Sequence, residues 1–190
     1  MEVYLIRHTK PLIGKGICYG QSDVPLVEPF ENDAITLMKH LPAKVDAVYT
    51  SPLSRCFKLA QLLGTSGEII KDARLMEMNF GDWELKNWGV IDQSILNTWM
   101  QDFVNVKVSA GENFVELYAR VGSFMDELIK KQYKSVAVVA HAGAIRSAVS
   151  KILEIPLKNA FKLPVDYASV TKLNISGDGC YTSLEYLNKL

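Results

Sequence analysis

Arg7 and His8 are the residues whose types most clearly suggest chemistry, and they follow an apolar run near the start of the chain. A strand over residues 2–7 would end at this pair and direct both side chains to one point. Histidine can act as a neutral nucleophile or carry a proton near pH 7, whereas arginine binds oxyanions through a planar, permanently charged fork. The pair indicates a site where a phosphate group is bound and attacked. The alternative is an incidental pair on the surface at a strand end.

Two later strands are expected to deliver partners to the same pocket. Residues 45–50 read as a strand, after which Ser51 is a good N-cap and the following proline a good first helical residue, with Arg55 one turn into that helix. Residues 135–140 are apolar throughout, as in a parallel strand covered on both faces, and His141 follows them. Because ligands bind outside the carboxyl ends of parallel strands, two histidines and two arginines should meet in one pocket. They suit a dianionic phosphoryl group.

Each of these side chains can be given a part in phosphoryl transfer. We expect neutral His8 to attack phosphorus and form a phosphohistidine, with its pKa depressed by Arg7 and Arg55. The two arginines would hold the nonbridging oxygens. A protonated His141 would stabilise the charge on those oxygens as the leaving group departs. The free N–H groups at the start of the following helix, that of Ala142 among them, could also meet the phosphate.

A leaving alkoxide needs a proton, and Glu77 is the candidate general acid. It lies in the irregular segment 75–92, which is rich in tryptophan and glycine. Repulsion between a carboxylate and a bound phosphate favours the protonated acid, which could later take a proton from the attacking water. Glu84 lies in the same segment and is the alternative carboxyl group.

Hydrophobic periodicity and turn residues predict alternating strands and helices. Strands are expected at 2–7, 45–50, 69–70 and 135–140, and a C-terminal β-hairpin at 168–175 and 180–187 around a Ser-Gly-Asp-Gly turn. Helices are expected at 30–41, 51–63, 93–104, 113–131 and 144–153, and a long loop at 10–28. Strands that alternate with helices imply an α/β sandwich with a mostly parallel sheet. We expect one domain over residues 1–190.

Composition narrows the class of protein further. The 190 residues carry 21 basic and 21 acidic side chains, and a net charge of zero argues against a nucleic-acid partner. Cys18, Cys56 and Cys180 have neither metal-site nor disulfide-framework spacing, which favours a reducing cytoplasm. We find no signal segment and no run approaching the ~18 apolar residues of a membrane span. A cytoplasmic protein is expected, and the C-terminal hairpin could supply the edge for a homodimer.

Four sequence segments together resemble the histidine phosphatase superfamily. They are Leu-Ile-Arg-His-Thr at 5–9, Ser-Pro-Leu-Ser-Arg at 51–55, Glu77, and His-Ala-Gly at 141–143. The superfamily includes phosphatases and phosphoglycerate mutases that work through a phosphohistidine, and the resemblance covers nearly the whole chain in order. It implies a three-layer α/β/α fold of the phosphoglycerate mutase type, the five side-chain roles given above, and no metal or other cofactor.

A narrower resemblance concerns three segments. Residues 17–26, 51–56 and 77–84 are similar to the α-ribazole phosphatase group, whose members remove the 5′-phosphate from α-ribazole phosphate or from the completed cobalamin phosphate. This resemblance adds Gln21 and Ser22 to Arg7, Arg55 and Ala142 as expected phosphate- or substrate-binding residues.

The chain also departs from the superfamily pattern. Thr9 and Gly14 stand where glycine and asparagine are common, and both residues also occur in α-ribazole phosphatase-like sequences, which favours that group over the mutases. Leu85 stands where many members have glycine and could reshape the mouth of the pocket.

The predicted function is phosphomonoester hydrolysis, with α-ribazole 5′-phosphate or adenosylcobalamin 5′-phosphate as the substrate. A mutase, in which a second substrate hydroxyl accepts the phosphoryl group, uses the same residues. A broad-specificity phosphatase for sugar phosphates or nucleotides is another alternative. A non-catalytic phospholigand-binding module would need only the arginines, so the presence of His8, Glu77 and His141 argues against it.

Overall fold

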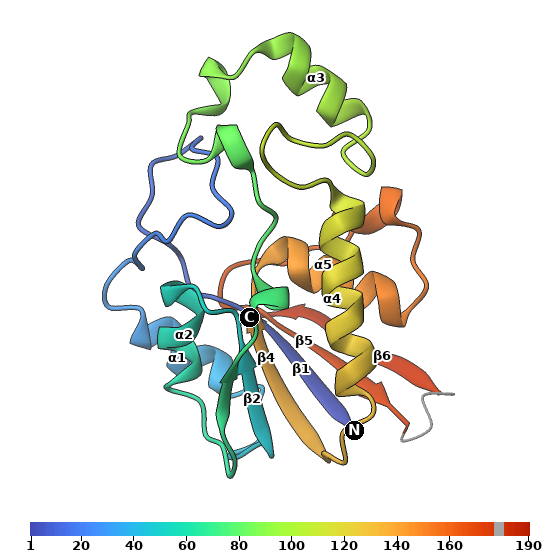
Figure 1. The fold of residues 1–190 in the computed structure, drawn as a ribbon. Helices are drawn as coiled ribbons and strands as arrows, with labels where there is room; N and C mark the ends of the chain where they lie inside the picture. Colours follow the sequence, from blue (N-terminus) through green and yellow to red (C-terminus); the bar gives the residue numbers. More distant parts are fainter. Residues whose placement is uncertain (177–180) are drawn as a thin grey trace.

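A central sheet of six strands forms the middle of the described part of the chain, residues 1–176 and 181–190 of this computed structural model (Figure 1). The strands are β1 (Glu2–Arg7), β2 (Ala47–Thr50), β3 (Ile69–Lys71), β4 (Ser135–Ala140), β5 (Val170–Ile175) and β6 (Thr182–Lys189). The helices are α1 (Glu31–Met38), α2 (Ser54–Ala60), α3 (Gln93–Gln101), α4 (Phe114–Leu128) and α5 (Ala142–Ile152). The expected alternation of strands and helices is confirmed.

The strand order is β3-β2-β4-β1-β5-β6, in which the first four strands are parallel and the last two join antiparallel. The mostly parallel sheet is therefore confirmed. The register pairs Arg7 with Ala140 and Thr50 with Val139, so β1, β4 and β2 end side by side. His8 follows β1 and donates its backbone N–H to Ala140 O at 3.2 Å. The residues after these three strands consequently start from one edge of the sheet.

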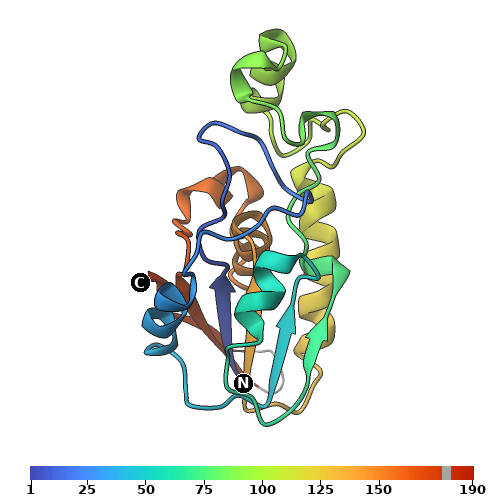
Figure 2. The same cartoon turned by 90° about the vertical axis from the view of Figure 1, so that its left-hand side faces the viewer.

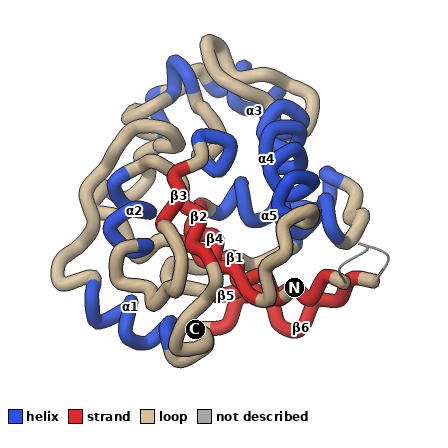
Figure 3. The backbone as a smooth tube through the Cα atoms, turned by 60° about the horizontal axis from the view of Figure 1, so that its bottom comes forward, coloured by secondary structure: helices blue, strands red, loops and turns tan. Residues whose placement is uncertain are grey.

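Helices cover both faces of the sheet, as Figure 3 shows. Alternate strand residues face opposite sides because side chains along a strand have a period of two. Val3 and Leu5 of β1 pack in the core formed with α4 and α5, whereas Tyr4 and Ile6 pack in the core formed with α1 and α2. β4 is buried from Val136 to Ala140, as expected for a strand covered on both faces. The three-layer α/β/α prediction is confirmed.

Several predicted boundaries are wrong. Helix α2 begins at Ser54 after an extended Leu53, so Ser51 is not its N-cap. Ser51 Oγ instead lies 2.9 Å from His141 Nε2. Helix α5 begins two residues earlier than expected, directly after His141. β5 and β6 do pair antiparallel, as expected for a hairpin, while residues 177–179 of the predicted Ser-Gly-Asp-Gly turn and Cys180 lie outside the described residues.

The segment from 75 to 113, which includes α3, stands beyond the carboxyl ends of the parallel strands (Figures 1 and 2). Aromatic rings hold it together: Trp83 and Trp99 meet edge to face at 5.7 Å, and Trp88 stacks on Trp99 at 6.4 Å. Asn113 and Glu116 form a capping box at the start of α4, which fixes where the segment returns to the body. Among the helices of the described residues, none has the length and apolar character to cross a membrane.

Candidate active site

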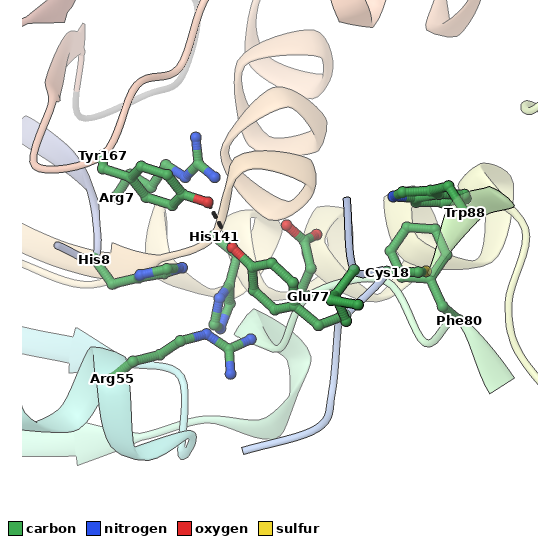
Figure 4. Close-up of a pocket in the computed structure, with 11 residues that line it drawn as sticks. Arg7, His8, Cys18, Arg55, Glu77, Phe80, Trp88, His141 and Tyr167 are labelled. Carbon is green, nitrogen blue, oxygen red and sulfur yellow. Dashed lines mark hydrogen bonds between the residues drawn. The ribbon is translucent and has the colours of Figure 1, made fainter. Parts of the chain in front are cut away.

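A cavity of about 210 Å³ opens at the carboxyl ends of β1, β2 and β4 (Figure 4). Within the described residues its lining consists of Arg7, His8, Ile17, Cys18, Tyr19, Arg55, Glu77, Phe80, Trp88, His141 and Tyr167. The five side chains expected to act on phosphate are all in this list. The topology explains the convergence, because β4 lies between β1 and β2 and the three strands end together.

His8 is buried and held in a defined orientation. Its Nδ1 lies 2.7 Å from the backbone oxygen of Thr9, which can only accept a hydrogen bond. The neutral ring therefore carries its proton on Nδ1 and leaves the Nε2 lone pair free, which is the form a nucleophile requires. Burial, and then the charges of Arg55 and Arg7, lower the pKa of His8 well below its usual range. The expected effect of the two arginines is present, but burial is the larger cause.

His141 lies beside His8, with ring centroids 5.1 Å apart and the planes at 63°. It is bonded at Nε2 to the hydroxyl of Ser51, and Cys56 Sγ lies 3.4 Å from the same nitrogen. Burial, the neighbouring His8, and the arginines lower the pKa of His141 well below its usual range. The protonated form expected for His141 is therefore disfavoured in this arrangement. A bound phosphate dianion would act in the opposite direction and favour it.

Arg7 and Arg55 are each anchored by backbone carbonyls. Arg55 is fully buried and donates to the carbonyls of Ser22, at 2.8 Å, and of Gly20. Arg7 donates from Nη1 to Val165 O at 2.6 Å, and its guanidinium lies 3.8 Å from the ring centroid of Tyr167. These contacts hold two guanidinium groups in place. The two groups come from different strand–helix units and line the same cavity.

The Glu77 carboxylate points toward the start of α5 (Figure 4). Its Oε2 accepts the backbone N–H of Gly143 at 3.0 Å, and its Oε1 accepts the N–H of Met78 at 2.9 Å. Arg120 of α4 donates to the carbonyls of Met76 and Glu77 and so holds the segment that carries this carboxylate. The sequence did not indicate this role for Arg120. The role becomes visible only because α4 lies beside the segment that carries Glu77.

Glu84, the alternative acid, accepts hydrogen bonds from the backbone and is not among the described residues that line the cavity. Its carboxylate accepts N–H groups of Gly20, Gln21, Ser22 and Phe80 at 2.9–3.1 Å. Burial would raise the pKa of Glu84, but hydrogen bonds led by those from Ser22 and Gly20 outweigh it and lower the pKa. This arrangement favours Glu77 over Glu84 as the acid.

Three of the expected phosphate- or substrate-binding residues are not part of the described lining of the cavity. Gln21 donates from Nε2 to Glu77 O at 3.0 Å, and Ser22 provides the carbonyl that holds Arg55. Ala142 is the first residue of α5 and is buried. In this structure Gln21 and Ser22 position other residues of the site.

Two tyrosines of the lining were not predicted. Tyr19 comes from the long loop and Tyr167 from the segment before β5, and their hydroxyl groups lie 2.6 Å apart. Tyr167 also lies against His8, with ring centroids 5.6 Å apart. The sequence shows no spacing that would have placed Tyr167 here.

Leu85 is not among the described residues that line the cavity, and its expected effect on the mouth of the pocket stays a prediction. Its side chain is 56% exposed, and its φ of 62° lies in the left-handed region. Glycine adopts this region without steric cost, which explains why glycine suits this position.

Comparison with known proteins decides the family. The family model of the histidine phosphatase superfamily (branch 1) matches residues 3–188, nearly the whole chain. The chain belongs to this superfamily. The geometry of the site also fits a histidine phosphatase. The prediction of a phosphatase is confirmed.

Relatives of this histidine phosphatase carry different substrate names. A protein of Hydrogenobacter thermophilus named "Putative phosphoserine phosphatase 2" is 31% identical over 198 aligned positions, covering 100% of this chain and 96% of that protein. The adenosylcobalamin/alpha-ribazole phosphatase of Salmonella typhimurium is 26% identical over 99% of this chain and 96% of its own length. The solved alpha-ribazole phosphatase of Shigella flexneri has the same fold, with a TM-score of 0.88 at 24% identity over 100% of this chain and 96% of that one.

The described residues of this histidine phosphatase contain no group of three or more His, Cys, Asp and Glu side chains that could hold a metal ion. Cys18 and Cys56 are buried and free, and burial is the main reason that the pKa of the Cys18 thiol rises to about 12. A thiolate nucleophile at Cys18 is therefore disfavoured.

Proposed function

We propose that this histidine phosphatase hydrolyses phosphomonoesters through a phosphohistidine formed on His8. The observation that carries the proposal is the hydrogen bond from His8 Nδ1 to Thr9 O, which leaves Nε2 free in a cavity that also holds Arg7 and Arg55. Nε2 attacks phosphorus and the phosphorus–oxygen bond to the leaving group breaks. The guanidinium groups bind the nonbridging oxygens, on which the charge is concentrated.

Glu77 supplies the proton to the departing oxygen, so that an alcohol leaves instead of an alkoxide. In the second half of the reaction it takes a proton from the water that attacks the phosphohistidine, and inorganic phosphate and neutral His8 are regenerated. The hydrogen bonds from Gly143 and Met78 support this role, because they hold the carboxyl group at the cavity wall.

His141 responds to the charge of the substrate. Burial, the neighbouring His8 and the arginines lower its pKa and keep it neutral before substrate binds. A phosphate dianion between His141 and the arginines favours the imidazolium, which then donates to a nonbridging oxygen. Ser51 orients the ring through its hydrogen bond to Nε2.

The preferred substrate in this proposal is α-ribazole 5′-phosphate or adenosylcobalamin 5′-phosphate. The similarity of loops 17–26 and 77–84 to the α-ribazole phosphatase group supports it, as do relatives of that name. The relative named for phosphoserine supports a second candidate, a small phosphorylated amino acid. The mutase and broad-specificity alternatives use the same five residues and differ in the acceptor or the leaving group.

Hydrolysis of p-nitrophenyl phosphate by the wild type and by His8→Ala tests the mechanism. We expect the variant to release no phosphate and EDTA to leave the wild type active. Full activity of His8→Ala, or strong inhibition by EDTA, would overturn the proposal. A panel of phosphomonoesters that includes α-ribazole phosphate then compares kcat/KM, and a flat profile would favour the broad-specificity alternative.

The single domain over residues 1–190, the cytoplasmic location and the homodimer all remain predictions. The long C-terminal strand β6 is an edge of the sheet and supports the expected place of a dimer contact. Sedimentation equilibrium tests the oligomeric state directly.

A further inference from the structure

An apolar cleft of about 410 Å³, formed mainly by the segment 75–113, has no part in the mechanism above. Its lining among the described residues is Phe80, Trp88, Leu96, Trp99, Met100 and Phe161. None of these side chains carries a charge, and most of them are aromatic. Met100 and Phe161 are exposed to solvent. A contiguous apolar surface that water can reach is typical of a binding site.

The apolar cleft adjoins the phosphate pocket, because Phe80 and Trp88 line both cavities. A smaller cleft of about 90 Å³ adjoins both of them, since Glu77 and Phe80 line it and it shares Trp99 with the apolar cleft. In Figure 4 the rings of Phe80 and Trp88 lie at the end of the pocket opposite His8. A molecule whose phosphate is held near His8 can therefore extend past Glu77 into the apolar cleft.

The position of the proposed acid selects this direction for the leaving group. Because Glu77 protonates the departing oxygen, that oxygen must lie beside its carboxyl group. Another cavity of about 400 Å³ also adjoins the phosphate pocket, but its described lining includes Lys10 and Lys15 and does not include Glu77. The atoms attached to the departing oxygen consequently leave the pocket on the side of Phe80.

The aromatic rings of the cleft are held in place by one another. Trp88 and Trp99 stack with ring centroids 6.4 Å apart, and Phe80 stands edge-on to both, at 5.8 and 6.2 Å. Aromatic faces and edges bind a further ring in offset or edge-to-face geometry. A charged group would lose its hydration in this cleft without gaining a charged partner from the described lining.

We propose that the apolar cleft is the leaving-group subsite of the enzyme and takes an uncharged aromatic or other bulky apolar group. The proposal rests on the proposed function and adds the place where the leaving group binds. α-Ribazole phosphate, whose base is aromatic, fits this class of substrate, whereas a phosphorylated amino acid with its additional charges does not. Met100 lines the cleft and not the described phosphate pocket, so it acts on substrate choice and not on phosphate binding.

2-Phenylethyl phosphate and ethyl phosphate test the subsite, because both release a primary alcohol and only the first has an apolar ring. We expect the kcat/KM of the wild type to be roughly 10- to 100-fold higher for the phenylethyl ester, the discrimination that an apolar pocket gives. In Met100→Gln this ratio should fall by about fourfold or more, which corresponds to one methylene that is no longer buried. Phe161→Ala should lower the ratio further, because it removes a ring from the cleft wall.

Ile95→Gln is the matched control. Ile95 and Met100 both lie on α3 and are 54% and 63% exposed, but Ile95 is not among the described residues that line the cleft. Ile95→Gln should keep the wild-type ratio. Kd values of the two esters in a His8→Ala background should show the same preference without turnover.

A ratio near one in the wild type would overturn the subsite, as would equal ratios in Met100→Gln and Ile95→Gln. If Met100→Gln left the ratio unchanged and lowered the sedimentation coefficient, a second copy of the chain would cover the cleft, which also overturns the subsite. Absence of all phosphomonoester hydrolysis in the wild type would instead refute the proposed function, while the Kd values still decide the subsite.

Discussion

Gly143 and Glu77 fit together so closely that residue 143 has no room for a side chain. The Gly143 N–H donates to Glu77 Oε2 at 3.0 Å, and a Cβ on residue 143 would lie 2.2 Å from Glu77 Oε1. The first turn of α5 therefore positions the proposed acid.

Gly143→Ala should displace the Glu77 carboxyl group and reduce kcat for alkyl phosphates by about 100-fold, within the usual contribution of a general acid. Inhibition by inorganic phosphate should change little, because the arginines are untouched. In the Gly143→Ala/Glu77→Gln double variant the losses should not add. Gly122→Ala is the control, since its new Cβ meets the Lys151 side chain at an ordinary contact distance, 3.6 Å from Cδ. A fully active Gly143→Ala enzyme would contradict this role.

Glu77→Gln should lower kcat by about 10²–10⁴-fold and leave the Ki of inorganic phosphate nearly unchanged. The glutamine keeps the size of the side chain but cannot supply the proton. The loss should be smaller for p-nitrophenyl phosphate than for an alkyl phosphate, because nitrophenolate departs without protonation. Steady-state kinetics with both esters measure the difference, and equal losses would speak against a proton donor.

The sequence was sufficient to predict the layers of the fold and which polar side chains lie at the carboxyl ends of the parallel strands. Arg7 ends β1, and His8 and His141 directly follow β1 and β4, so a parallel sheet alone brings them together. Glu77 lies in an irregular segment whose path depends on contacts with Arg120 and α5, and only the family pattern selected it over Glu84.

Other features depend on contacts between residues far apart in the chain. Ser51 has the local signature of an N-cap, but its hydroxyl bonds to His141, 90 residues away. Tyr167 was missed because nothing in the sequence around it marks it as part of the site. The positioning contacts of Gln21 and Ser22 could not be predicted, because they join their backbone to Glu84 and Arg55 far along the chain, and the expected part of both residues in binding phosphate or substrate stays a prediction.

The lowered pKa values of His8 and His141 predict how stability depends on pH. Below pH 6.5 the unfolded chain binds protons that the folded protein does not, so the free energy of unfolding should fall as pH decreases. Each histidine contributes a slope of up to about 1.4 kcal/mol per pH unit between its folded pKa and 6.5, and nothing above that window. Urea unfolding between pH 5 and 7.5 measures the slope, which should be smaller for His8→Gln. A free energy of unfolding that is constant across this pH range would refute the lowered pKa values of the two histidines.

Leu85→Gly should stabilise the protein by about 0.5–1 kcal/mol, because relief of a left-handed conformation exceeds the added entropy of the unfolded chain. Activity should not change, since the side chain is exposed and outside the described cavity lining. Leu12→Gly is the control, an exposed leucine without positive φ, and should give no gain. Chemical denaturation of the wild type, Leu85→Gly and Leu12→Gly measures the three free energies of unfolding. A Leu85→Gly protein less stable than the wild type would refute backbone strain at residue 85.

The phosphohistidine on His8 is the central claim, and trapping it is the most direct test. Wild-type protein mixed rapidly with a phosphomonoester, quenched in alkali and digested should yield a phosphorylated peptide that contains His8. The label should be stable to alkali, labile to acid and absent from His8→Ala. Hydrolysis without any such peptide in the wild type, or a phosphorylated peptide that persists in an active His8→Ala protein, would contradict the mechanism.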